Sequence, residues 1–225
     1  MIRLLAYVCL AITVECHTRQ ETYTIYAASS LAGTLDQAIE ELNLTSKIQV
    51  VYGSSSQLAR QLEAGASADL FISAHDRWTK RVHTALPVMC LWSNQLVIAS
   101  SGPRDDDPFT DNVRIAMGDP VHVPQGMYGR QALTSMNLWK HMEHRIVPAP
   151  DARTCIRYLS TGMVAYAVVY KSDAIRYHLH IHQPIDSDTH DPIRYQAVFL
   201  DPPPEWFTSL ANSDVFGRQG FQPCR

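Results

Sequence analysis

Short apolar runs and amphipathic stretches alternate along the chain from residue 22 onward. Runs such as Asp-Leu-Phe-Ile-Ser at 69–73 are typical of buried strands, whereas apolar positions spaced by three or four residues predict helices. We expect strands at residues 22–27, 47–52, 69–73, 114–117, 144–147 and 164–170, and helices at 31–42, 56–64, 76–83, 126–136 and 152–160. Strands that alternate with helices in this way predict parallel sheets in an α/β fold.

A loop divides this pattern into two units. The segment Gly-Pro-Arg-Asp-Asp-Asp-Pro at 102–108 follows an apolar stretch at 96–100, and the alternation of strands and helices then begins again. A further strand predicted at 194–200 returns the chain to the first unit. Periodicity alone also allows a single sheet of many strands. We expect an α/β protein of two lobes, each a mainly parallel sheet flanked by helices, with lobe 1 formed by residues 17–95 and 195–225 and lobe 2 by residues 96–194.

Residues 1–16 have the pattern of a secretory signal peptide. Arg3 supplies a positive charge, and the apolar run at 4–14 is far shorter than the roughly 20 residues that span a bilayer. We therefore expect cleavage after Cys16 and export to the periplasm. A lipid tether on Cys16 is an alternative that Glu15 disfavours, and a buried first strand is another.

Composition narrows the possible function classes. The chain has 225 residues, of which 46% are hydrophobic and 18% charged, so it can form a globular core. Lys and Arg total 19 against 22 Asp and Glu, which gives a formal charge of -3 and argues against nucleic acid as a partner. The five cysteines include no C-x-x-C pair, so they support neither a zinc site nor a thioredoxin-type motif. An exported protein can form a disulfide, but the sequence leaves its pair open.

Loops rich in small and hydroxyl-bearing residues precede four of the predicted helices, at residues 26–30, 53–56, 119–126 and 148–152. A helix start exposes unpaired backbone N–H groups and the positive end of the helix dipole, which together attract anions. In parallel sheets these four starts lie at the carboxyl edges of the strands, where α/β ligands bind. Each loop taken alone is explained by ordinary helix capping. Taken together, two starts from each lobe predict a small-anion site in the cleft.

Five motifs carry a family resemblance. Gly-Ser-Ser-Ser-Gln-Leu-Ala-Arg stands at 53–60, Ala-Ala-Ser-Ser-Leu at 27–31, Gly-Asp-Pro-Val-His-Val-Pro-Gln-Gly at 118–126, Val-Pro-Ala-Pro-Asp at 147–151 and Val-Val-Tyr-Lys-Ser-Asp-Ala at 168–174. In this order they resemble the periplasmic molybdate-binding proteins, which are the solute receptors of molybdate ABC importers. The resemblance covers nearly all of the chain after residue 16. It implies the two-lobed type II fold of periplasmic binding proteins.

The resemblance also implies which residues bind the ligand. Gln125 stands where a small residue is usual in the family and Ala152 where valine is frequent, but both would contribute main-chain N–H groups, for which the side chain matters less. The implied ligand residues are Ser30 (with Ser29 as a rival by one position), Ser55, Gln125, Ala152 and Tyr170.

The implied ligand is molybdate, with tungstate expected to bind as well, and molybdenum enters only as the bound oxyanion. No other cofactor is expected. The implied partner is the inner-membrane permease of an ABC transporter, and we expect a monomer. None of the matched side chains is a carboxylate or a cation, so binding would depend on hydroxyl groups and backbone dipoles.

Three other interpretations compete with this one. A serine hydrolase would need a base for Ser54, Ser55 or Ser56, but the run lacks the G-x-S-x-G elbow, so no enzyme is expected. The alternating histidines at 178, 180 and 182 would share one face of a strand and could bind a metal, although a solvated strand face explains them better. The same scaffold could also bind another oxyanion such as sulfate. Relative to the family, the segment around 85–92 is shortened.

Overall fold

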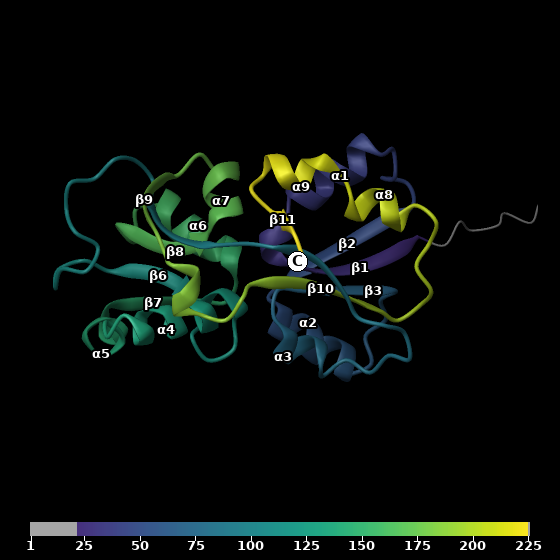
Figure 1. Cartoon of the computed structure of the whole chain (residues 1–225), viewed down its shortest axis with the longest axis horizontal. Coiled ribbons are helices and arrows are strands. Elements are labelled where there is room, and N and C mark those ends of the chain that lie inside the picture. Colours follow the sequence, from purple (N-terminus) through teal and green to yellow (C-terminus); the bar gives the residue numbers. More distant parts are fainter. Residues whose placement is uncertain (1–21, 225) are drawn as a thin grey trace, which may run out of the picture.

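Two sheets with flanking helices form two lobes that lie side by side (Figure 1). The structure is a computed structural model and describes residues 22–224, so the predicted signal peptide and Cys16 lie outside the described residues. Within residues 22–224, no helix has the length and apolar character needed to span a membrane.

The elements follow the predicted alternation of strands and helices. The strands are β1 (Tyr23–Ala28), β2 (Ile48–Gly53), β3 (Leu70–Ser73), β4 (Met89–Ser93), β5 (Leu96–Ser100), β6 (Ile115–Gly118), β7 (Ile146–Ala149), β8 (Tyr166–Tyr170), β9 (His180–Pro184), β10 (Arg194–Phe199) and β11 (Gln222–Pro223). The α-helices are α1 (Thr34–Glu41), α2 (Ser55–Glu63), α3 (Asp76–Thr79), α4 (Pro124–Ser135), α5 (Trp139–Met142), α6 (Ala152–Ser160), α7 (Lys171–Arg176), α8 (Phe207–Ala211) and α9 (Asp214–Arg218).

Lobe 1 contains a six-stranded sheet with the order β11-β4-β10-β3-β1-β2, and lobe 2 a five-stranded sheet with the order β7-β6-β8-β5-β9. In lobe 1, α1, α8 and α9 lie on one side of the sheet and α2 and α3 on the other (Figure 1). The predicted two-lobed α/β fold is confirmed. The domain boundaries expected at residues 95 and 195 stay predictions.

Both sheets are mixed in direction and not mainly parallel as expected: four of the nine strand pairings in residues 22–224 are parallel and five are antiparallel. β1 pairs with β2 and β3 in parallel, and β6 pairs with β7 and β8 in parallel, because helices connect these strands. β10 and β5 pair antiparallel with their neighbours. They enter their sheets from the segments that connect the lobes, so no crossover helix imposes a parallel direction. The helix and turn starts that face the cleft therefore follow parallel strands, namely β1 and β2 in lobe 1 and β6 and β7 in lobe 2.

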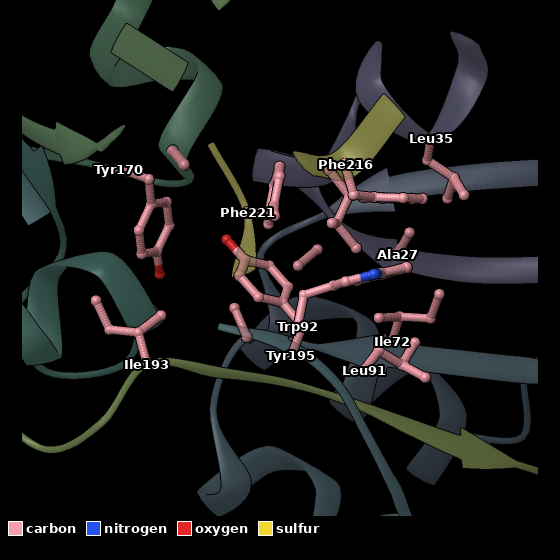
Figure 2. Close-up of a cluster of buried hydrophobic side chains, with 14 of the residues drawn as sticks. Ala27, Leu35, Ile72, Leu91, Trp92, Tyr170, Ile193, Tyr195, Phe216 and Phe221 are labelled. Atoms are coloured by element: carbon pink, nitrogen blue, oxygen red, sulfur yellow. The ribbon is translucent and has the colours of Figure 1, made fainter. Parts of the chain in front are cut away.

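Aromatic side chains at the inner end of lobe 1 form part of its core (Figure 2). Trp92 stacks on Phe216 with 3.8 Å between ring centroids, and Phe221 packs edge-on against Tyr195 at 5.3 Å. Because Phe216 lies in α9 and Phe221 just before β11, the C-terminal segment completes the hydrophobic core of lobe 1. Burying side chains of this size contributes roughly 1.5–3 kcal/mol each.

A disulfide bond between Cys90 and Cys224 attaches the C-terminal segment to β4. The sequence left this pairing open; Cys155 is buried and has a free thiol. The two bonded cysteines are 134 residues apart, and a link across so long a loop restricts the unfolded chain strongly. A disulfide is consistent with an oxidising compartment.

Several predictions from the sequence differ from the structure, among them the helix expected at 76–83, which ends at Thr79, and the strand expected at 144–147, which is Ile146–Ala149. The helix expected from residue 31 begins at Thr34, because Ser29–Leu31 form a 3-10 turn and Gly33 has a φ of 78°. The three alternating histidines do not share a strand, since β9 begins at His180 and His178 has a φ of 51°. Among the described residues, no three His, Cys, Asp or Glu side chains are grouped to hold a metal ion.

Candidate anion-binding site

Four strand ends meet at the cleft between the lobes. In lobe 1, β1 is followed by the 3-10 turn at Ser29–Leu31 and β2 by α2; in lobe 2, β6 leads to α4 and β7 to α6. The turn and the three helix starts enclose one small cavity, whose lining residues are Ala28, Ser29, Ser30, Ser54, Ser55, Ala74, Val123, Pro124, Gln125, Ala152 and Tyr170. The structure therefore brings together all five residues predicted as ligands and the rival Ser29.

The cavity is small compared with the other hollows. The space between its lining atoms, open solvent included, is about 200 Å³, compared with about 1050 Å³ and 1010 Å³ for two larger surface hollows counted in the same way. No Asp, Glu, Lys, Arg or His is among the residues that line it. A ligand here would interact with hydroxyl groups, amides and helix dipoles, and not with a counter-charge.

The serine hydroxyls of lobe 1 have different partners. Ser55 Oγ accepts a hydrogen bond from Ala74 N at 3.0 Å, and Ser30 Oγ is 2.8 Å from Tyr195 Oη. Ser29 Oγ reaches across the cleft and accepts from Ala152 N at 3.3 Å. Both Ser29 and Ser30 line the cavity, so the geometry leaves both in place as candidates.

Close packing at the start of α4 determines the position of its first turn. A Cβ atom on Gly126 would lie 1.9 Å from Gly118 O, so only glycine allows the helix to approach the end of β6 this closely. Pro124 occupies the N1 position, where its missing N–H costs nothing. The N–H groups of this first turn have no helical acceptor, which leaves them available to an anion. Gln125 lies within this turn.

The start of α6 is capped in the usual way. Asp151 Oδ1 accepts from Thr154 N at 2.8 Å, and this cap leaves Ala152 N directed to the cleft side, where it meets Ser29. A carboxylate at the N-cap therefore stabilises the helix without lining the cavity.

Tyr170, at the end of β8, is 1% exposed, and its hydroxyl has no hydrogen-bond partner among residues 22–224. Burial holds the pKa of this hydroxyl well above its usual range, so it stays protonated and able to donate. Figure 2 shows Tyr170 facing Tyr195 across the junction of the lobes, with 6.1 Å between ring centroids. Tyr170 also lines the cavity, so its unpartnered hydroxyl is a candidate donor to a ligand there.

Sequence reasoning missed two residues that form hydrogen bonds with the serines predicted as ligands. Tyr195 holds the Ser30 hydroxyl, and Ala74 offers its N–H to Ser55. Tyr195 lies inside a strand predicted only from its apolar pattern, and nothing in that pattern distinguishes it. Ala74 is the last residue of the segment 53–74, over which the family resemblance continues beyond the motif at 53–60, and this resemblance was the only signal that could have indicated it.

The bacterial extracellular solute-binding protein family matches residues 23–212 of this chain. The chain belongs to this family. Relatives of this solute-binding protein include ModA, the molybdate-binding protein of Escherichia coli K12, which is 30% identical over 197 residues, 79% of this chain and 77% of the relative. ModA of Haemophilus influenzae is 31% identical over the same shares of the two chains.

A solved structure shares the fold. The periplasmic molybdate-binding protein of Azotobacter vinelandii superposes with a TM-score of 0.79, covering 90% of this chain and 100% of that one at 21% identity. The resemblance noted from the motifs is therefore confirmed by relatives and by the two-lobed type II fold. The family is one of solute-binding proteins.

Proposed function

We propose that this solute-binding protein binds molybdate, and tungstate as well, in the cavity between its lobes and delivers the anion to the permease of an ABC importer. The proposed ligand groups are the hydroxyls of Ser30 or Ser29, Ser55 and Tyr170 and the main-chain N–H groups of Gln125 and Ala152. The E. coli and H. influenzae relatives are molybdate-binding proteins, which supports this choice of anion. The predicted signal peptide and the disulfide bond support a periplasmic location.

One observation carries the proposal: the cavity is lined by hydrogen-bond donors from both lobes and by no charged side chain. Molybdate is a fully deprotonated tetrahedral dianion at neutral pH, so it accepts hydrogen bonds at every oxygen. A hydrogen phosphate ion also needs an acceptor for its own proton, and a carboxylate to provide one is missing from the lining residues. Each hydrogen bond to a charged ligand contributes roughly 1.5–3 kcal/mol, so several together support tight capture.

The anion would also link the lobes. Donors from the 3-10 turn and α2 lie on one side of the cavity, and donors from α4, α6 and β8 lie on the other. An anion held from both sides stabilises the closed arrangement more than an open one, and this difference drives closure. The closed form is the one we expect the permease to recognise.

Thermal unfolding with added anions tests the ligand. A ligand present at 100 times its Kd stabilises the folded state by about 2.7 kcal/mol, so molybdate and tungstate should each raise the Tm clearly. Sulfate and phosphate at the same concentration should raise it little. If sulfate raised the Tm as much as molybdate, the protein would be a general oxyanion receptor. If none of the four anions changed the Tm, the cavity would not be an oxyanion site.

The variant Tyr170→Phe tests the site itself. It removes only a buried hydroxyl that has no partner among the described residues, so the free protein should keep its Tm or gain slightly. The molybdate Kd, measured by calorimetry, should rise by roughly 10-fold or more, the value of one hydrogen bond to a charged group. Tyr158→Phe is the matched control, because Tyr158 lies on α6 outside the cavity lining. Unchanged affinity in Tyr170→Phe would remove Tyr170 from the site.

A further inference from the structure

The side chain of Gln125 lies in the first turn of α4 and is 1% exposed. Its carboxamide oxygen accepts two hydrogen bonds, from Gly118 N at 3.0 Å and from Cys155 Sγ at 3.2 Å. One donor comes from the end of β6 and the other from α6, so the amide is held between two elements that both border the cleft.

These two donors fix which way round the amide lies. A flipped amide would place its NH2 group against the N–H of Gly118, and two donors cannot bond to each other. Cys155 is fully buried, and burial raises the pKa of its thiol well above the usual range, so the sulfur keeps its proton and remains a donor. The Gln125 oxygen is therefore committed to protein donors, and the NH2 group points elsewhere.

The NH2 group of Gln125 is buried and has no acceptor among residues 22–224. The same is true of the Tyr170 hydroxyl, and both residues line the one small cavity. A buried donor without an acceptor costs free energy, which a ligand that accepts hydrogen bonds recovers on binding. Because Gln125 and Tyr170 line the same cavity, one ligand bound there could accept from both donors.

We infer that the side-chain amide of Gln125 donates a hydrogen bond to the bound oxyanion, in addition to the bond proposed for its main-chain N–H. This inference rests on the proposed function and adds a specificity-determining group to it. Nε2 can donate but cannot accept, so it favours an oxyanion that carries no proton. Cys155 acts as a positioning residue, since its thiol holds the amide oxygen away from the ligand.

The first test compares Gln125→Ala with wild type. The alanine variant keeps the main-chain N–H and loses the whole carboxamide, including the oxygen that accepts from Gly118 N, so its molybdate Kd should rise roughly 10- to 100-fold. Gln131→Ala is the matched control: it makes the same substitution on α4, but Gln131 bonds Asp191 and lies outside the cavity lining. The control should bind molybdate with the affinity of wild type.

The second test reverses the hydrogen-bonding character of the same side chain. Gln125→Glu keeps the shape and an oxygen for Gly118 N, but presents a carboxylate in place of the NH2 group. Molybdate binding should fall by more than in Gln125→Ala, and the ratio of phosphate to molybdate affinity should rise, because the carboxylate accepts a proton-bearing oxygen. Gln125→Met, which keeps the volume, provides the comparison if the alanine variant does not fold by circular dichroism.

The outcomes separate this inference from the proposed function. If wild type binds molybdate and both Gln125→Ala and Gln125→Met bind it equally well, Gln125 supports only the packing of α4, and the inference is overturned. If wild type itself binds neither molybdate nor tungstate, the proposed function fails first. A weaker Kd in both variants with an unchanged Gln131→Ala control supports the amide as a ligand.

Discussion

Asp173 lies three residues after Tyr170, in the first turn of α7, and is 3% exposed. Its Oδ2 atom has no hydrogen-bond partner among residues 22–224. Burial raises the pKa of this carboxyl to about 8, while Arg153 and Arg176 act in the opposite direction and Asp151 adds to the rise. At neutral pH the side chain is therefore mainly neutral, and it adds little repulsion to an anion bound near Tyr170.

The raised pKa predicts a pH dependence of stability. Between the ordinary aspartate pKa near 4 and the folded value of about 8, the folded protein holds a proton that the unfolded chain releases. The free energy of unfolding therefore falls as pH rises through this window, and the contribution is constant above it. Asp173→Asn removes this titration, so its Tm relative to wild type should rise as pH increases from 5 to about 8.

Melting curves of both proteins in a buffer series from pH 5 to 9 measure the effect. Because all other groups titrate alike in the two proteins, the difference in Tm isolates Asp173. A constant Tm difference across the series would show that Asp173 is ionised in the folded protein.

Single residues differ in how far the sequence could predict them. Ser55, Ala152 and Tyr170 could be predicted because each lies in a short motif of neighbouring residues. The structure brings all three to one cavity. The roles of Asp173 and of the Gln125 amide could not be read from the chain, because both depend on burial by elements far away in sequence. The proposal for Gln125, for example, needs Cys155, which is 30 residues away.

At the scale of elements, the sequence predicted helices well where the capping residue is local. α2 and α6 begin within one residue of expectation because Ser54 and Asp151 accept from the first turns of these helices. The predicted α4 begins two residues late, since Pro124 already forms its first position. α8 and β11 were not predicted, because neither contains the continuous apolar run that identifies a short strand such as β3.

The contact between α4 and β6 gives a prediction at this scale. Gly126→Ala places a Cβ where Gly118 O lies, so α4 must move away from the strand. We expect a loss of about 1–3 kcal/mol in the free energy of unfolding, together with weaker molybdate binding, because the first turn of α4 shifts. Denaturation in urea measures the first effect and calorimetry the second.

A second glycine provides the control for this variant. Gly217 lies in α9 with no atom near the position of its Cβ, so Gly217→Ala should leave binding unchanged and stabilise the helix slightly. Equal stability of Gly126→Ala and wild type would show that α4 tolerates a wider spacing from β6 than its packing implies.

At the scale of the whole molecule, two connecting segments join the lobes. They lie side by side, with Asn94 N donating to Ile193 O at 3.3 Å, and the Asn94 side chain bonds Ser172 at 2.8 Å. The alternating pattern predicted two units, but it could not predict which strand ends meet. The Cys90–Cys224 pair is an example, because it depends on β11 pairing with β4 across most of the chain.

Contacts between the lobes outside the cavity also contribute to closure. Tyr128 on α4 of lobe 2 donates its hydroxyl to Ala74 O of lobe 1 at 3.1 Å, and its ring stacks on His75 with 4.8 Å between centroids. Tyr128 does not line the cavity, so we expect its effect on affinity to come mainly through the equilibrium between open and closed forms.

Tyr128→Phe separates closure from ligand contact. It keeps the ring on His75 and removes one hydrogen bond between the lobes, worth about 0.5–1.5 kcal/mol, so the molybdate Kd should rise roughly 2- to 10-fold. Stopped-flow measurements should assign the change mainly to faster release, because the closed form that retains the anion is less stable. Tyr158→Phe, on α6 of lobe 2, should leave both rates unchanged. An unaltered Kd in Tyr128→Phe would mean that the bond to Ala74 persists when the lobes open, and that closure depends on the anion contacts alone.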